Sequence, residues 1–180
     1  MAKVKMAFTD YFPQVMDRLR DDGLLLVTKG NDGKPNPMTI GWGTIGSVWG
    51  LPMCVVLVRP SRYSYSRLEE NGDFTVNVPP KDMADAALHC GTVSGRDQDK
   101  IANLKLTVTP AQKVSVPIIE ECVVHYECQT VQRNDVVPEA LAQKIDDSAY
   151  ASGDYHRIYY GQIVAAYADE DAALRLGGDT

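Results

Sequence analysis

Alternating apolar and polar residues recur along the chain and predict strands more often than helices. Residues 74–78 alternate strictly, and this alternation places Asn77 on the same face of a strand as Thr75. Residues 53–59 are apolar at both parities, which is typical of a strand that is covered on both faces. Further strands are expected at residues 24–29, 37–46, 106–109, 122–132 and 156–167.

Short helices are expected between these strands. Asp10 is placed to cap a helix that ends at residues 21–23, and Ser61 begins a second helix. A third helix is expected over residues 83–90, with Gly91 as its stop. The remaining segments are a short helix or turn at 101–105, a polar loop at 146–154, and a short acidic helix or frayed tail at 170–180.

Because strands outnumber helices and short turns join most of them, the pattern favours a mainly β fold. The Asp-Gly pair at 32–33 predicts a hairpin between the first two strands. A closed or half-closed antiparallel barrel with a few short peripheral helices fits the order of elements best. The 180 residues are enough for one domain, taken as residues 1–180, that buries roughly 70% of its unfolded surface.

Composition narrows the class of protein. With 44% hydrophobic and 23% charged residues, the chain is typical of a soluble globular protein. Its formal net charge of -6 disfavours binding to nucleic acid or to anionic membranes. The apolar runs are far shorter than the roughly 20 residues that span a bilayer, so no membrane segment is expected. Widely spaced cysteines and an N-terminus without an apolar signal core predict a reduced, cytoplasmic protein.

Glycines at positions 41, 43 and 46 lie within the expected strand at 37–46, where glycine weakens a strand unless something approaches the backbone closely. Gly41, Gly43 and Gly46 also match the dinucleotide fingerprint G-x-G-x-x-G. Residues 47–52 have no helical period and include a proline, so this match is rejected. A backbone laid against a flat ring explains the glycines better, with side chains for hydrogen bonds or stacking between them. Those side chains are Thr39, Trp42 and Thr44.

Cationic residues gather in two loops, 59–64 and 94–100, of an otherwise acidic chain. A phosphate monoester is held by backbone N–H groups at a helix start, by hydroxyl donors and by cations, and the first loop supplies all three. The alternative is that Arg59 and Arg62 are solvated surface charges beside a capping serine. The candidate phosphate-binding residues are Arg59, Ser61, Arg62, Tyr63, Ser64, Ser94, Gly95 and Lys100.

Cysteine and histidine do not indicate a metal site. Cys122, His125 and Cys128 share one strand, but strand periodicity places His125 on the face opposite the two cysteines, which favours core packing. His156 is different, because it follows a loop and opens a long strand at the expected rim of the barrel. It is the candidate catalytic residue, and the alternative is a histidine that only packs at the rim.

Five segments in this order together resemble the flavin reductase-like, FMN-binding split-barrel family, and within it the flavoredoxin branch. These segments are residues 36–42, 59–64, 74–78, 94–100 and 156–161. The resemblance covers about residues 10–168. It implies a split β-barrel homodimer that binds FMN non-covalently near the subunit interface. Electrons would come from NAD(P)H or from a protein donor.

The resemblance also implies roles for particular residues. Segment 38–44, with Thr39, Gly41, Trp42, Gly43 and Thr44, is similar to the segment of the family that contacts the flavin ring. Loop 59–64 and Lys100 resemble its phosphate ligands, and Asn77 resembles a ring or ribityl contact. Many relatives have Gly-Glu where this chain has Gly161-Gln162, so no role is carried over to that position.

Two functions remain open at this point. The first is an FMN-dependent oxidoreductase, and the second is a non-catalytic FMN-binding electron carrier that works with a redox partner protein. A barrel without a cofactor is a third hypothesis.

A homodimer is expected because a small barrel leaves the long edge of a flavin uncovered. Apolar interface area is expected from Ile158, Tyr159, Tyr160 and Tyr167.

Overall fold

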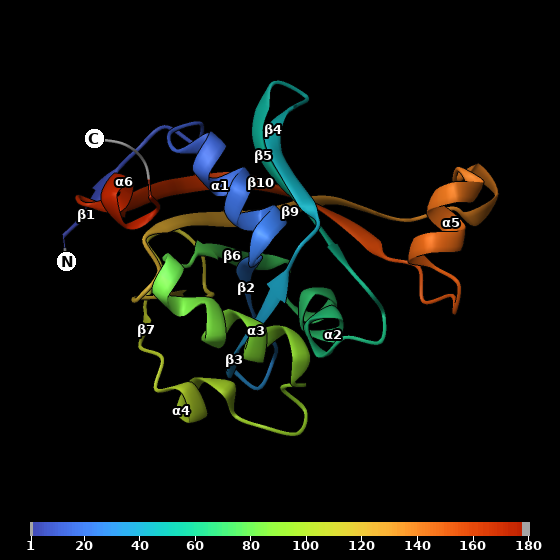
Figure 1. The fold of residues 1–180 in the computed structure, drawn as a ribbon, viewed down its shortest axis with the longest axis horizontal. Helices are drawn as coiled ribbons and strands as arrows, with labels where there is room; N and C mark the ends of the chain where they lie inside the picture. Colours follow the sequence, from blue (N-terminus) through green and yellow to red (C-terminus); the bar gives the residue numbers. More distant parts are fainter. Residues whose placement is uncertain (1, 178–180) are drawn as a thin grey trace.

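An antiparallel sheet of eight strands forms the body of the protein in the computed structural model, which describes residues 2–177 (Figure 1). Seven strands follow the order β3-β2-β6-β9-β10-β5-β4, and β1 pairs with the far end of β10. The strands are β1 (Lys3–Lys5), β2 (Leu24–Lys29), β3 (Pro35–Ile40), β4 (Gly43–Val48), β5 (Leu51–Val58), β6 (Asp73–Val78), β9 (Val124–Asp135) and β10 (Arg157–Asp169). A separate pair is formed by β7 (Val108–Thr109) and β8 (Ile118–Ile119).

The two ends of the strand order are consecutive in the chain. β3 lies at one end and β4 at the other, yet only Gly41 and Trp42 connect them. A linker this short requires the twisted sheet to curl back on itself. The curled sheet confirms the expected mainly β, antiparallel, half-closed barrel. The expected hairpin is also present, because β2 pairs with β3 around the turn at 32–33.

The expected single strand at 37–46 is wrong. β3 ends at Ile40, β4 begins at Gly43, and the chain changes direction between them. Gly43 has a packing reason to be glycine, because a Cβ there would lie 2.6 Å from the carbonyl oxygen of Val55 on the neighbouring β5. Gly46 has open space around its Cβ position. A closely approaching ligand is therefore not needed to explain Gly43, and no neighbour within the described residues explains Gly46.

Asn77 is a structural residue of the barrel core. It shares a face of β6 with Thr75, as the alternation predicts, but that face is covered by the segment around β8. Its amide donates to the Leu25 carbonyl at 3.3 Å and to Thr75 Oγ1 at 3.0 Å, and its oxygen accepts from the Ile119 amide at 3.1 Å. The His125 ring nitrogen Nδ1 also contacts that oxygen at 2.8 Å. All of its hydrogen-bonding capacity is used within the core.

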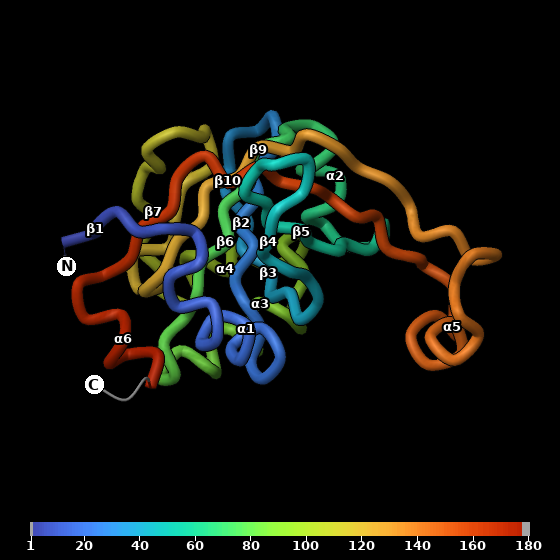
Figure 2. The backbone as a smooth tube through the Cα atoms, turned by 90° about the horizontal axis from the view of Figure 1, so that it is seen from above, coloured from blue at the N-terminus to red at the C-terminus, as the bar shows by residue number. Residues whose placement is uncertain are grey.

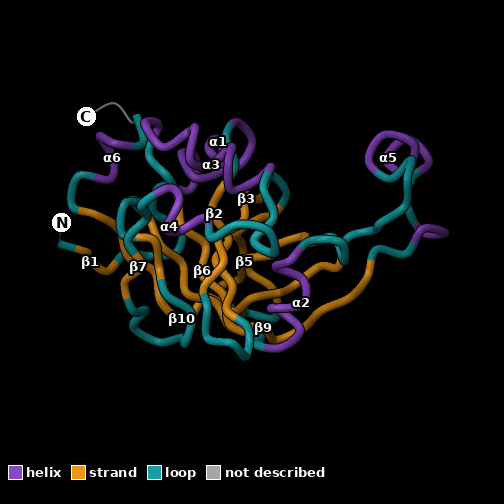
Figure 3. Tube along the Cα trace, turned by 90° about the horizontal axis from the view of Figure 1, so that it is seen from below, coloured by secondary structure: helices purple, strands orange, loops and turns teal. Residues whose placement is uncertain are grey.

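The helices lie mainly on one side of the sheet (Figure 3). They are α1 (Phe12–Asp21), α2 (Tyr63–Glu70), α3 (Ala84–Thr92), α4 (Lys100–Leu104), α5 (Gln143–Ala149) and α6 (Ala172–Arg175), with short 3₁₀ turns at Lys81–Met83 and Pro138–Ala140. No helix within residues 2–177 combines the length and the apolar character needed to cross a membrane.

Several helix boundaries differ from the expectation. Asp10 does not cap α1; it accepts a hydrogen bond from the Ala7 amide, and Tyr11 occupies the N-cap position in a left-handed conformation. Gly91 does not stop α3, which runs on to Thr92. The expected polar loop at 146–154 begins inside α5. The expected tail helix is α6, and residues 178–180 of that segment lie outside the described residues.

A two-stranded arm extends from the body of the sheet and ends in α5 (Figures 1 and 2). It is formed by the C-terminal half of β9 and the N-terminal part of β10, which remain paired from Asp135 with Arg157 to Gln132 with Tyr160. Apolar side chains along it are exposed to solvent. The exposed fractions are 46% for Val131, 55% for Val137 and 48% for Ile145.

Candidate functional site

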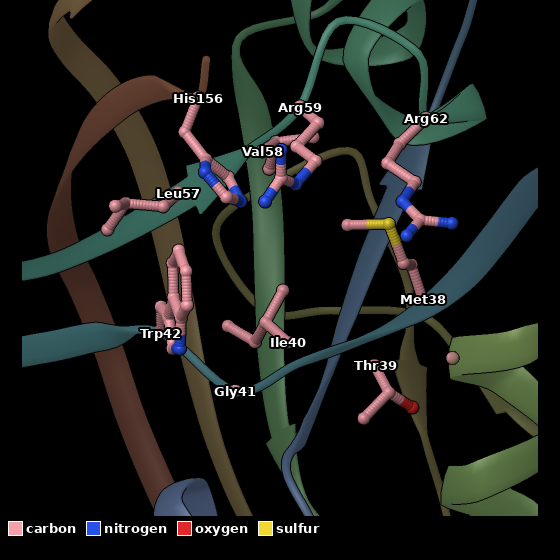
Figure 4. A pocket seen from close by; sticks show the side chains of 11 residues that line it. Met38, Thr39, Ile40, Gly41, Trp42, Leu57, Val58, Arg59, Arg62 and His156 are labelled. Carbon is pink, nitrogen blue, oxygen red and sulfur yellow. The ribbon is translucent and has the colours of Figure 1, made fainter. Parts of the chain in front are cut away.

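Two adjoining cavities form a groove beside β3, β5 and α2. The first, here called the Trp42 cavity, has a volume of about 200 Å³ and is shown in Figure 4. The second, here called the Lys100 cavity, has a volume of about 100 Å³. Met38, Arg62 and Gly91 line both cavities, so a single elongated ligand fits the groove better than two separate small ones.

The groove brings together most of the residues expected from the sequence. Thr39, Gly41, Trp42, Arg59, Arg62 and His156 line the Trp42 cavity. Ser61, Arg62, Tyr63, Ser64, Ser94, Gly95 and Lys100 line the Lys100 cavity. Gly43, Thr44 and Asn77 line neither cavity, because Gly43 and Thr44 face the small space under α1 and Asn77 is in the core.

Three cations, Arg62, Arg96 and Lys100, line the Lys100 cavity, and no carboxylate is among its lining residues. Lys100 is only 3% exposed, and its ammonium donates one hydrogen bond, to the Cys90 carbonyl at 3.1 Å. No carboxylate within the described residues pairs with it, and burial lowers the pKa of Lys100. The Arg62 guanidinium has neither a hydrogen bond nor an ion pair to any residue in the described part of the chain. A buried cation such as Lys100 is normally paired, so this arrangement is typical of a site that binds an anion.

Uncharged donors surround the same cavity. Ser64 is fully buried, and its hydroxyl accepts a hydrogen bond from the Asn36 amide at 2.9 Å. This bond leaves the hydroxyl hydrogen of Ser64 available. α2 begins at Tyr63, and no side chain caps its N-terminus, so the N–H groups of Tyr63 and Ser64 are free to bind an anion. Cations, a hydroxyl and a helix N-terminus together suit a phosphate group.

Gly95 closes the Lys100 cavity on the side of the 94–100 loop, and we expect its replacement to damage that wall. A Cβ at Gly95 would lie 1.9 Å from Asn36 Oδ1 and 2.9 Å from Tyr63 Cδ1. Gly95→Ala should lower the free energy of unfolding by about 1–3 kcal/mol, as overpacking does. Urea denaturation measures this. Gly46→Ala is the control, because nothing lies within 4 Å of its Cβ position; a matching loss in both variants would contradict the prediction.

Arg59 is not a free cation. Its guanidinium donates to the carbonyl oxygens of Ala149 at 2.8 Å, Asp154 at 2.9 Å and Gly153 at 3.3 Å, and it lies over the ring of Tyr150 at 5.1 Å. Its donors are therefore used to hold the segment 149–154. This arrangement argues against the phosphate-binding role expected for Arg59, although its side chain lines the Trp42 cavity.

Ser61 is held in a similar way. Its hydroxyl donates to Asp154 Oδ2 at 2.6 Å, and its amide donates to Asp154 Oδ1 at 3.2 Å. Its carbonyl accepts from Arg96 at 2.9 Å. Within the 59–64 loop, the groups left free for an anion are therefore Arg62, Ser64 and the start of α2.

His156 lies at the end of the Trp42 cavity farthest from Arg62. Figure 4 shows its ring and Arg59 on one side of the cavity, with Trp42 and Ile40 facing them. The centroids of the His156 and Trp42 rings are 5.0 Å apart. Burial lowers the pKa of His156 to about 4, and the nearby Arg59 charge adds to the effect, so the ring is neutral at neutral pH. Its Nδ1 contacts the Tyr150 hydroxyl at 2.8 Å, whereas Nε2 has no partner among residues 2–177.

The sequence indicated the segments 36–42 and 38–44 but gave no individual role to several residues of the groove. Met38, Ile40 and Leu57 contribute its apolar walls, and Asn36 orients Ser64. The apolar residues carry only the general strand pattern, which does not distinguish a cavity wall from core. Tyr150 contacts His156 of the Trp42 cavity, although it belongs to a segment that is expected to be a polar loop.

The fold and the groove define a half-closed antiparallel β-barrel protein with a cation-lined cavity next to a cavity that is lined by Trp42, His156 and apolar residues. The chain belongs to the family of the flavin reductase like domain, whose model matches residues 17–176. Its fold is therefore that of the flavin reductase-like, FMN-binding split barrels, as the sequence resemblance indicated.

Known relatives agree with this assignment. The structure is similar to the flavoredoxin of Desulfovibrio vulgaris (Miyazaki F), with 25% identity and a TM-score of 0.67 over 83% of this chain and 70% of that one. It is also similar to the flavoredoxin from Methanosarcina acetivorans, with 28% identity and a TM-score of 0.65 over 83% of this chain and 69% of that one.

An uncharacterized protein of Archaeoglobus fulgidus is 35% identical over 99 residues. That match covers 55% of each chain, so this chain aligns with little more than half of its relative.

Proposed function

We propose that the protein binds FMN non-covalently along the groove and acts as an oxidoreductase that takes electrons from NAD(P)H or from a protein donor. The observation that carries this proposal is the pair of unpaired cations, Lys100 and Arg62, beside the free start of α2. The FMN phosphate would occupy the Lys100 cavity, held by Arg62, Lys100 and Ser64. The isoalloxazine ring would extend into the Trp42 cavity, because the two cavities are continuous through Arg62.

The residues of the Trp42 cavity suit a flat ring. Ile40, Leu57 and Met38 offer apolar contacts, and Thr39 and Gly41 come from the same end of β3. FMN, when bound, supplies the electron-transfer chemistry. The protein's part is to hold the ring, keep water from it and present polar groups at its edges. Neutral His156 would act there as a hydrogen-bonding group rather than as a positive charge.

An absorption spectrum tests the cofactor directly. Purified protein, or protein mixed with FMN, should show flavin bands in the blue and near ultraviolet, and fluorescence quenching should give tighter binding for FMN than for riboflavin. If riboflavin bound as tightly as FMN, the Lys100 cavity would not be a phosphate site, because riboflavin has no phosphate. Oxidation of NADH or NADPH in the presence of FMN then tests the enzymatic reading.

The alternative is an FMN-binding electron carrier that works with a redox partner protein. One observation favours it: Trp42, at the wall of the cavity, is 47% exposed, so this end of the groove is accessible to another protein. A carrier would hold FMN but would not oxidise NADH or NADPH at a catalytic rate. Steady-state nicotinamide oxidation therefore separates the two functions.

We further propose a homodimer, formed through an outer face of the sheet. This outer face consists of Val55 and Leu57 of β5 with Tyr160 and Ile158 of β10, which lie opposite one another in register and are half-buried. Leu57 also lines the Trp42 cavity, so a subunit packed here would cover the flavin ring. The other two residues expected at the interface, Tyr159 and Tyr167, are buried in their own chain at 0% and 3% exposure and cannot contribute.

We expect Ile158→Glu to separate the subunits, because it places a charge in the centre of the outer face. Light scattering should report a dimer for the wild-type protein and a monomer for the variant. Leu88→Glu is the control, since Leu88 is 64% exposed on α3, away from the outer face. A wild-type monomer that retains FMN would contradict the dimer.

A further inference from the structure

Only one nitrogen of the His156 ring, Nδ1, has a hydrogen-bond partner within the described residues. The Tyr150 hydroxyl lies 2.8 Å from Nδ1, and Tyr150 itself is 5% exposed. Its ring packs edge-on against both Trp42, at 6.4 Å between centroids, and His156, at 5.5 Å. The Tyr150 ring therefore packs against Trp42 and His156, two residues of the Trp42 cavity that belong to other segments of the chain.

The direction of this hydrogen bond follows from the partners available. Within the described chain, the Tyr150 hydroxyl has no acceptor other than His156 Nδ1, and a buried hydroxyl hydrogen rarely goes without one. Tyr150 must then donate to Nδ1. A neutral imidazole that accepts at Nδ1 carries its hydrogen on Nε2, the nitrogen without a protein partner.

Arg59 holds the segment that carries Tyr150. It donates three hydrogen bonds to the carbonyl oxygens of Ala149, Gly153 and Asp154, on both sides of Tyr150, and its guanidinium also covers the Tyr150 ring. Asp154 is fixed in turn by two hydrogen bonds from Ser61. The segment 149–154 is thus attached to the end of β5 at several points, although it follows the exposed α5.

We propose that Tyr150 is a positioning residue that fixes His156 as the Nε2–H tautomer, with Arg59 clamping the segment that carries Tyr150. His156 then presents a permanent N–H donor toward the Trp42 cavity. This inference rests on the proposed function only in naming the flavin ring as the group that His156 meets. The tautomer and its dependence on Tyr150 are properties of the flavin-free protein.

Long-range ¹H–¹⁵N NMR of flavin-free protein measures the tautomer. The chain has only three histidines, and His156→Gln identifies the signals of His156. In the wild-type protein, Nδ1 should be unprotonated and Nε2 protonated. In Tyr150→Phe, the two tautomers should mix, because the donor that distinguishes Nδ1 from Nε2 is lost. The pKa of His156 should stay below its usual value, because burial, the largest cause of its lowering, is unchanged. Arg59, Arg62 and Asp154 are the charges that face His156, and this variant leaves all three in place.

Tyr155→Phe is the matched control. Tyr155 stacks on Tyr150 at 4.7 Å, but its hydroxyl donates to Asp146 at 2.7 Å, so the same chemical change in the same segment leaves the contact with His156 intact. Its His156 signals should match those of the wild-type protein. Arg59→Lys keeps the charge but cannot reach three carbonyls, and it should shift the signals in the direction of Tyr150→Phe. An unchanged tautomer in Tyr150→Phe, or a wild-type ring protonated at Nδ1, would overturn the proposal.

With FMN bound, Tyr150→Phe should slow flavin reduction about tenfold while changing FMN affinity less than about threefold. If the NMR result holds but reduction keeps its wild-type rate, the positioning stands and the proposed role of His156 in the reaction falls. If FMN does not bind at all, the NMR result still decides the positioning.

Discussion

Replacing Lys100 by methionine should weaken FMN binding about tenfold to a hundredfold. Hydrogen bonds to charged groups contribute about 1.5–3 kcal/mol each, and the buried ammonium of Lys100 is the group best placed to make one with a phosphate. The effect should be specific to the phosphate, so riboflavin affinity should change little. Fluorescence titration with both ligands measures the difference.

The same variant should not destabilise the flavin-free protein. Burial lowers the pKa of Lys100, which means that the charged ammonium is costly in the folded state when no anion is present. Methionine of similar length removes that cost. Lys34→Ala is the control, because Lys34 is exposed and does not line the Lys100 cavity. Equal losses of FMN affinity in Lys100→Met and Lys34→Ala would mean that FMN binding depends on the overall positive charge near the groove and not on a specific contact with Lys100.

The second large effect is expected at His156. His156→Ala should slow the reduction of bound FMN about tenfold to a thousandfold, the range for a lost polar or proton-transferring group. FMN affinity should change little, since the cations that would hold the phosphate lie at the other end of the groove. Rapid mixing with NADH or NADPH, after flavin occupancy has been checked, gives the rate.

If neither nicotinamide reacts, the midpoint potential of the flavin provides a second measurement. Loss of an N–H donor at the ring edge that gains charge should make the potential more negative. His89→Ala is the control, because His89 is only half-buried on α3 and lines neither cavity. A wild-type rate and potential in His156→Ala would leave His156 as a packing residue.

The barrel was predictable because its strands have regular patterns. Strand β6 alternates strictly and β5 is apolar at both parities, and both lie where the sequence indicated. The glycines of 37–46 show the limit of this reasoning. Glycine signals a close approach to the backbone, but Gly43 is approached by the Val55 carbonyl of its own sheet rather than by a ligand. Sequence alone does not tell which group approaches.

The cations show a different limit. Arg59 and Arg62 lie three residues apart in one loop and look equivalent in the sequence. In the structure Arg59 is bound to carbonyl groups about ninety residues farther along the chain, and Arg62 is free. Tyr150 was missed for the same reason, since its neighbours at His156, Trp42 and Arg59 come from three other segments. Long-range packing decides which side chains remain available.

The segment 149–154 connects the exposed arm with the Trp42 cavity. It follows α5 in the chain, and it contains Tyr150, which contacts two residues of that cavity. A second subunit that packed against the arm or covered the outer face would therefore also act on the site where we place the flavin. Such coupling is reciprocal: FMN must tighten self-association by the same factor by which self-association tightens FMN. The apparent affinity for FMN would then rise with protein concentration, and dilution would release flavin and separate the subunits together.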